Sequence, residues 1–202
     1  EIEERTCIAL VRSFLIPLRS RGVVRLDAHT TFVDFANVRL SLDIAAQLSL
    51  PVVTIVETTG ADPSAGSEAE GIAGLIARLT EKMLQAPVPI LSVVTGEGGS
   101  GGALAFATAD ILLASERSVF SVIGPEGAAE ILWKDAARAP EAARLLKLTP
   151  HDLLDLGIAD QVIPAGVESL KRAVTYHLGR LHEGHDPREA PKSRRARWRN
   201  SW

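Results

Sequence analysis

Apolar residues recur along this chain in two alternating patterns, short continuous runs and longer stretches with a helical period. A helix is predicted over residues 34–50 because apolar side chains return at helical spacing, namely Val38, Leu42, Ala45 and Ala46. Pro51 ends this helix, and the continuous run Val52–Val56 that follows predicts a buried strand. The first clearly patterned part of the chain is therefore a helix that leads directly into a strand.

The same alternation continues towards the C-terminus. A second helix carries Ile72, Leu75, Ile76, Leu79 and Met83 on one face and ends before Pro87, and Ile90–Val94 predicts a second buried strand. Further strands are predicted at residues 111–114 and 119–123, and helices at 125–131, 136–147, 150–156 and 166–181. Continuous apolar strands that alternate with helices are typical of an α/β fold in which helices cover a parallel sheet on both faces.

The two ends of the chain have no such pattern. Residues 1–29 stay unassigned, although Val23–Leu26 fits a short strand, and residues 187–199 are basic and polar, which favours a mobile tail. We expect one domain over residues 1–186 and a basic tail over 187–202. Because the chain begins with glutamate and its only methionine is Met83, we also expect it to be a piece of a longer protein.

Composition narrows the function classes. The 202 residues are 46% hydrophobic and 23% charged, as in a soluble globular domain, and the net charge of −3 gives no general attraction to nucleic acid. The single cysteine, Cys7, excludes an intrachain disulfide and a cysteine metal cluster, so no metal is expected. No apolar run reaches the ~18 residues that would span a membrane, and no signal peptide is visible, so we expect a cytoplasmic location.

The candidate chemistry begins in a glycine-rich stretch. Glycine occupies five of the seven positions from Gly96 to Gly102, between a predicted strand and a helix-forming run. Glycine lets backbone N–H groups approach a ligand, and a helix that starts at Gly101 or Gly102 adds unpaired donors and the positive end of its dipole. The stretch therefore predicts a site for a developing negative charge.

Other interpretations of this stretch stay open. A tight turn that lets a helix pack on a strand needs the same glycines. A dinucleotide-binding turn also fits the spacing of Gly96, Gly98 and Gly101, with Glu116 near the position of its acidic residue. Ser100 is placed like a nucleophile, but such a serine needs a base, and the chain has no histidine between His29 and His151.

Several further motifs follow in a fixed order. Glu57–Pro63 reads ETTGADP after one buried strand, GEGGSGGALA follows the next, PEG and ILWK occupy residues 125–134, and LGIADQVIP spans 156–164. Together these motifs resemble the alpha half of the carboxyltransferase of biotin-dependent acetyl-CoA carboxylase, a crotonase-fold family, over about Phe35 to Pro164. The resemblance implies a crotonase-type (ClpP/crotonase-like) fold with parallel sheets flanked by helices.

The resemblance also implies a reaction and a set of site residues. A carboxyl group moves from carboxybiotin to an acyl-CoA, with acetyl-CoA the expected acceptor in fatty acid biosynthesis. The N–H groups of Gly102 and Ala103 would stabilise the oxyanion on the biotin ureido group. Residues implied to bind biotin or substrate are Gly60, Ala61, Gly98, Gly99, Ser100, Gly101 and Glu126.

The implied partners lie outside this chain. A carboxyltransferase beta half would supply the acyl-CoA side of the site, and a biotin carboxyl carrier protein would bring the carboxybiotin. We expect the chain to form a heteromer or a homo-oligomer. The basic tail is a candidate for contact with CoA phosphates or with a partner subunit, and Trp133 for the core or a subunit interface.

One loop departs from the family pattern. The family has Asp-Thr-Pro-Gly-Ala where this chain has Glu57-Thr58-Thr59-Gly60-Ala61, so a proline is lost at Thr59 and the acidic side chain is longer. Two alternatives therefore remain. One is a crotonase-type acyl-CoA hydratase or isomerase, which needs a carboxylate pair that would include Glu126. The other is a degenerate carboxyltransferase half without catalytic activity.

Overall fold

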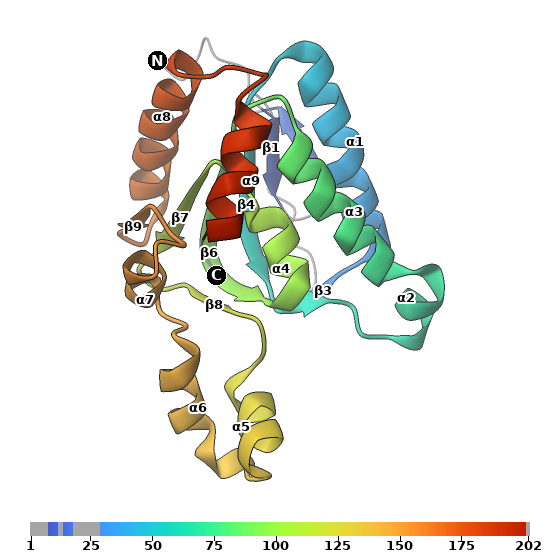
Figure 1. Ribbon diagram of the computed structural model, residues 1–202, viewed down its shortest axis with the longest axis vertical. Helices are drawn as coiled ribbons and strands as arrows, with labels where there is room; N and C mark the ends of the chain where they lie inside the picture. The colour runs from blue at the N-terminus through green and yellow to red at the C-terminus, as the bar shows by residue number, and fades with distance from the viewer. Residues whose placement is uncertain (1–7, 12–13, 18–28, 201–202) are drawn as a thin grey trace.

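A computed structural model describes residues 8–11, 14–17 and 29–200 (Figure 1). In chain order the elements are β1 (Ile8–Val11), β2 (Phe14–Pro17), β3 (His29–Thr30), α1 (Phe32–Leu48), β4 (Val52–Thr58), β5 (Gly60–Ala61), α2 (Ala65–Glu70), α3 (Ile72–Gln85), β6 (Ile90–Gly99), α4 (Ser100–Ala107), β7 (Ile111–Ser115), β8 (Val119–Ser121), α5 (Pro125–Trp133), a 3-10 turn η2 (Ala136–Arg138), α6 (Ala139–Leu146), α7 (Pro150–Asp155), β9 (Gln161–Ile163), α8 (Val167–Glu183) and α9 (Ala190–Asn200).

One sheet runs through the described part of the chain in the order β2-β1-β4-β6-β7-β9, and β8 pairs with the far end of β6. The pairs β1–β4, β4–β6, β6–β7 and β7–β9 are parallel, and only β1–β2 at the edge is antiparallel. The predicted α/β fold with a parallel sheet is therefore confirmed.

Helices cover both faces of this sheet. On one face, α1, α3, α4 and α9 enclose the main core, which holds Phe35, Leu79 and Val94. On the other face, α8 covers a smaller cluster around Leu91 and Val93 (Figure 1). Val93 and Val94 are neighbours in β6 yet belong to opposite clusters, because successive side chains of a strand point to opposite faces.

Most predicted elements are found close to their expected bounds. The helix predicted over 34–50 is α1, and the strand predicted at 119–123 ends earlier, at Ser121. The helix predicted over 136–147 is divided into η2 and α6. The strand expected at Val23–Leu26 lies outside the described residues.

The prediction of a mobile tail is wrong for residues 190–200, because they form the helix α9. Arg194 is 1% exposed and Trp198 is 8% exposed, and one helical turn separates them on the face that packs on the core. The indole Nε1 of Trp198 donates to the carbonyl of Ala109 at 3.0 Å. A helix with such anchors is part of the domain, although its sequence is strongly polar.

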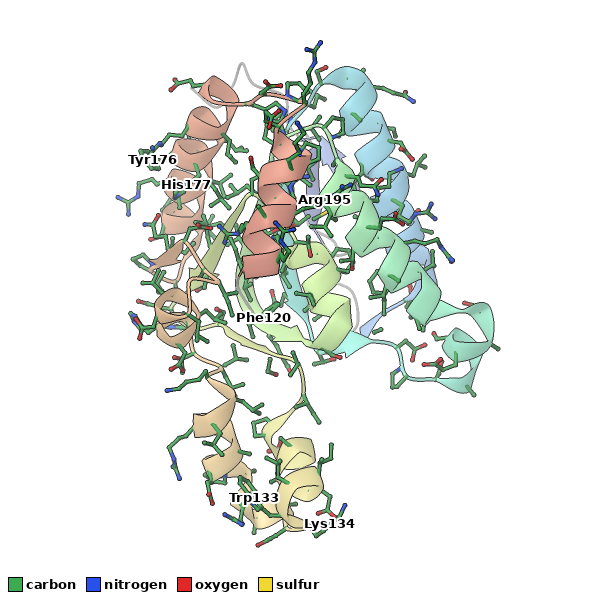
Figure 2. The ribbon with its side chains drawn as sticks, in the orientation of Figure 1. Phe120, Trp133, Lys134, Tyr176, His177 and Arg195 are labelled. Carbon is green, nitrogen blue, oxygen red and sulfur yellow. The ribbon has the colours of Figure 1, made fainter. Side chains whose placement is uncertain are left out.

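A pair of helices projects from the body of the molecule. This arm, residues 122–147, contains α5, η2 and α6 and extends away from the sheet (Figure 1). In Figure 2, Trp133 and Lys134 lie near its tip, and Phe120 lies where the arm leaves the body. Among the described helices, none combines the length and the apolar character needed to cross a membrane.

Candidate active site

The glycine-rich stretch lies between a strand and a helix, as predicted, but most of it is strand, because β6 continues through it to Gly99. The register of β4 against β6 shifts between Val56, opposite Val94, and Thr58, opposite Gly98. Beyond this bulge, Glu97–Gly99 pairs with β8. The strand is thus carried past the rest of the sheet and delivers the next residues at its carboxyl edge, where α/β folds commonly place their ligand sites.

Two backbone segments meet at this edge. A Cβ built on Gly99 would lie 2.0 Å from the carbonyl oxygen of Thr59, and one built on Gly102 would lie 2.7 Å from the amide nitrogen of Ala61. Gly60 has a φ of 137°, which suits only glycine. Gly99 and Gly102 are therefore required because main chain packs against main chain. Gly60 and Ala61, which the resemblance implies at the same site, lie beside Gly102.

Helix α4 begins at Ser100, one residue before the predicted start at Gly101 or Gly102. Gly99 is its N-cap, and Ser100 has a φ of 56°, in the left-handed region where serine is strained. In a helix that begins here, the N–H groups of Ser100, Gly101 and Gly102 have no intrahelical acceptor, whereas that of Ala103 can pair with the carbonyl of Gly99. The helix start thus favours Gly101 and Gly102 over Ala103 as free donors.

Side chains close the glycine segment from both sides. A Cβ on Gly98 would lie 2.4 Å from Cδ2 of Phe120, so the ring of Phe120 occupies the space above that backbone. On the opposite side, Gly96 faces the Glu57 side chain, whose carboxylate also accepts a 3.4 Å hydrogen bond from Thr95. The altered Glu57 therefore supports the β6 bulge.

The neighbouring loop is held by polar contacts that the sequence analysis did not single out. The buried hydroxyl of Thr58 donates to the carbonyl of Gly60 at 3.0 Å and lies 3.2 Å from the Gly60 amide, which donates to it. Farther along, Asp62 accepts from the hydroxyl groups of Ser64 and Ser67. Threonine and serine beside glycine and aspartate are common in turns, and this composition is the sequence feature that could have identified these loop-supporting residues.

Glu126 lies apart from this backbone junction, in the first turn of α5 at the base of the arm, where its side chain is exposed. A carboxylate there is stabilised by the helix dipole. Gly98, Ser100 and Gly101 adjoin the junction directly in the chain, and Ser100 is exposed at the start of α4. The structure thus gathers the predicted glycines and Ala61 around one point, whereas Glu126 belongs to the arm.

His177 lies away from this junction. His177 lies on α8, across the sheet from α4, and contacts Gln161 at 2.8 Å. Burial is the main cause that lowers the pKa of His177, and the nearby Asp160 acts in the opposite direction. Within the described part of the chain, no three His, Cys, Asp or Glu side chains are grouped as metal ligands would be.

A parallel sheet flanked by helices, with a backbone-lined site at the carboxyl edge, defines a crotonase-type fold. The chain belongs to the family of acetyl co-enzyme A carboxylase carboxyltransferase-like proteins, whose model matches residues 36–185. This membership also sets aside a dinucleotide-binding turn as the explanation of the glycines.

Curated relatives agree with the family. The chain is 52% identical over 148 residues to an acetyl-coenzyme A carboxylase carboxyl transferase subunit alpha of Jannaschia sp., covering 68% of this chain and 46% of that protein. It is 47% identical over 168 residues to the subunit alpha of Paracoccus denitrificans, covering 78% and 52%. A Salinispora tropica protein named for subunits beta/alpha is 48% identical over 151 residues, covering 69% and 27%. The chain thus spans about half the length of the alpha relatives.

Solved structures share the fold. A chain of a Pseudomonas malonate decarboxylase hetero-tetramer in complex with coenzyme A matches with a TM-score of 0.73 at 18% identity, covering 100% of this chain and 89% of that one. A transcarboxylase 12S chain with hydrolyzed methylmalonyl-coenzyme A bound matches with a TM-score of 0.67 at 23% identity, covering 74% and 31%. At these identities the likeness shows the fold alone.

Proposed function

We propose that this chain forms the biotin side of a carboxyltransferase site, which moves a carboxyl group from carboxybiotin to an acyl-CoA, with acetyl-CoA as the acceptor. The observation that carries the proposal is the backbone junction of Gly102 with Gly60–Ala61 in a member of the carboxyltransferase family. The relatives named for acetyl-CoA carboxylase support acetyl-CoA as the acceptor.

The residues at the junction fit a ligand on whose oxygen negative charge develops. Carboxybiotin, when bound, supplies the carboxyl group and leaves such charge on its ureido oxygen. The N–H groups of Gly101 and Gly102, in the first turn of α4, would donate to that oxygen, and Ala103 is the less available donor. Donors of this kind act without reorganisation, and each contributes about 3 kcal/mol to a transition state.

The other residues of the segment would shape and close the site. Gly98 and Gly99 keep side chains away from the floor, and Ser100 is exposed beside the donors. Gly60 and Ala61 form the second wall. Glu126 would lie at the outer rim, because α5 starts just beyond the strand that pairs with Glu97–Gly99.

The proposed reaction needs two partners. A carboxyltransferase beta half would bring the acyl-CoA, and the Salinispora relative that carries both subunit names on one chain supports this pairing. A biotin carboxyl carrier protein would deliver the carboxybiotin.

The proposal is tested by the reverse reaction, the decarboxylation of malonyl-CoA in the presence of free biocytin and a carboxyltransferase beta subunit. Gly102→Ala places a methyl group 2.7 Å from the Ala61 amide nitrogen, so the two backbone segments must move apart and the residue 102 donor is displaced. The rate is expected to fall about 100-fold or more, the size of effect found when one such donor no longer reaches the oxyanion. Gly179→Ala in α8 has open space around its added methyl group and is the matched control.

Each outcome decides the proposal. Biocytin-dependent decarboxylation that survives in Gly179→Ala and is lost in Gly102→Ala, with both variants folded by circular dichroism, supports it. A verified complex that is inactive with biocytin contradicts it and favours a degenerate subunit. Turnover of enoyl-CoA substrates by that complex would favour the hydratase or isomerase class.

A further inference from the structure

The arm exposes large apolar side chains to solvent. Ile131 is 65% exposed, Leu145 is 63% exposed, and Val122 and Leu132 are each 60% exposed. Among the described residues, seven of the eleven exposed large hydrophobic side chains lie between residues 119 and 156. Four of the seven belong to the arm, and a concentration of exposed apolar side chains is typical of an interaction site.

The interior of the arm makes this exposure more unusual. Its buried residues are three alanines, Ala128, Ala129 and Ala142, with larger side chains only partly buried against them. Ile131, Leu132 and Leu145 thus face solvent, whereas the alanines face the partner helix, with Ile123 and Leu146 partly buried against them. Two short helices with so little buried apolar area gain little stability alone, because helical stability in proteins comes mostly from packing.

The arm also contains residue types that are enriched at protein interfaces. The guanidinium of Arg138 stacks on the ring of Trp133 at 3.9 Å, and aromatic and arginine side chains are the residue types that dominate binding energy at interfaces. Exposed charges of both signs surround the apolar residues, such as Glu130 on α5 and Arg144 on α6. An apolar centre with a polar rim is the usual arrangement.

The position of the arm indicates what covers it. β8 pairs with the glycine segment at Glu97–Gly99, and α5 begins only four residues after β8 ends at Ser121. The arm therefore leaves the body at the rim of the candidate site. A partner that presents a second substrate to the donors of α4 is therefore expected to lie beside the arm.

We infer that the arm is the docking surface for a carboxyltransferase beta half, with Ile131, Leu132 and Leu145 at the centre of the contact. This inference rests on the proposed function, which requires such a partner. The relative that carries beta and alpha on one polypeptide supports a partner that is held close to this chain.

The inference is tested by measuring the affinity of the chain for the purified Paracoccus denitrificans carboxyl transferase beta subunit. Leu132→Lys and Leu145→Lys place a cation in the last turn of α5 or α6, where the helix dipole favours it, so the helices are kept. Each is expected to weaken binding about tenfold or more, as for the loss of an interface anchor. The matched control is Leu48→Lys, in the last turn of α1, where leucine is 61% exposed.

Binding that is lost in the arm variants and kept in Leu48→Lys supports the inference. Unchanged binding of both arm variants overturns it and leaves the proposed function standing. If the arm variants break only a self-association seen by analytical ultracentrifugation, the arm is a homodimer surface and the inference is also overturned. Failure of the unmodified chain to bind the beta subunit contradicts the proposed function itself.

Discussion

At the scale of single residues, Arg194 shows how a basic side chain can hold a helix on an apolar core. Its guanidinium donates to both carboxylate oxygens of Asp110, at 3.0 and 2.7 Å, and to the carbonyl groups of Met83, Ala86 and Val88. Those carbonyls end α3 and lead into β6, and a cation is favoured at the C-terminus of a helix. The buried charge is therefore fully paired.

We predict that Arg194→Ala destabilises the protein by about 3–5 kcal/mol, because three carbonyl groups lose their guanidinium donor and the Asp110 carboxylate keeps only its hydrogen bond from the Ile90 amide. The measurement is the free energy of unfolding in urea. Arg195→Ala removes an exposed neighbour on the same helix and is expected to change stability by less than about 0.5 kcal/mol. Equal losses in the two variants would contradict the role given to Arg194.

The candidate site could be located from sequence at this scale, but not explained. The composition of the stretch marked Gly99 and Gly102, and the reason offered was access of N–H groups to a ligand. The structure adds that both positions touch the backbone of residues 59–61. That contact depends on how β4 and β6 pair, so spacing along one chain cannot reveal it. The basic segment that contains Arg194 was expected to be a mobile tail for the same reason, since the acceptors of Arg194 lie 84 to 111 residues earlier.

At the scale of elements, α7 begins with a reciprocal cap. The hydroxyl of Thr149 accepts from the Asp152 amide, and the Asp152 carboxylate accepts from the amide and hydroxyl of Thr149. The Thr149 hydroxyl is the main cause that holds the pKa of Asp152 below the ordinary value of 3.8, followed by the Thr149 backbone. Because the folded pKa is lowered, this stabilisation is present above about pH 4 and is lost as the pH falls through the folded pKa.

We predict that Thr149→Ala raises the pKa of Asp152 towards its ordinary value and shortens α7. Carboxyl carbon NMR titration of Asp152 measures the first effect, and amide exchange at residues 151–153 measures the second. A pKa that stays as low in Thr149→Ala as in the unmodified chain would assign the shift instead to the backbone amide of residue 149, which the variant keeps, and to Lys147.

Elements that bury a periodic apolar face were predicted well, and the failures have a common cause. The α1 and α3 helices and the β4 strand follow directly from hydrophobic period. The extension of β6 through glycines and the α9 helix were missed, because each is stabilised by contacts with distant segments, β8 in one case and the turn after α3 in the other. Local pattern carries no record of such contacts.

At the scale of the whole molecule, the sheet and the arm differ in how much surface they bury. β4 and β6 are central in the sheet, and their side chains are largely buried, whereas the arm packs mainly on itself. Local opening costs least where few apolar contacts are made. The arm is therefore expected to open locally more readily than the sheet, and to be stabilised when a partner covers it.

We predict that backbone amides in α5 and α6 exchange with deuterium faster than those of β4 and β6 in the isolated chain. Addition of a carboxyltransferase beta subunit is expected to slow exchange in the arm, while α8, on the far side of the sheet, keeps its rates. Mass spectrometry of peptic fragments provides the measurement. Arm amides as protected as those of β6 before any partner is added would contradict this view of the molecule.

The parallel sheet and its helical layers could be inferred from the alternation of elements, but the direction of the arm could not. Nothing in residues 122–147 distinguishes a helix pair that folds back on the sheet from one that projects, because both need one apolar face. The outward-facing Ile131 and Leu145 decide the matter only once the structure shows that alanines fill the inner face.

The junction of Thr59–Ala61 with Gly99 and Gly102 has a consequence for how this chain can change over evolutionary time. Because main-chain atoms form the floor, the side chains at positions 57 and 59 can change while the backbone junction is kept, and Glu57 and Thr59 already differ from the family pattern. Substitution is expected to be least tolerated at Gly99 and Gly102, because a Cβ atom at either position would collide with backbone atoms. Substitutions are therefore expected to accumulate among the side chains around the junction, whereas positions 99 and 102 are expected to stay glycine.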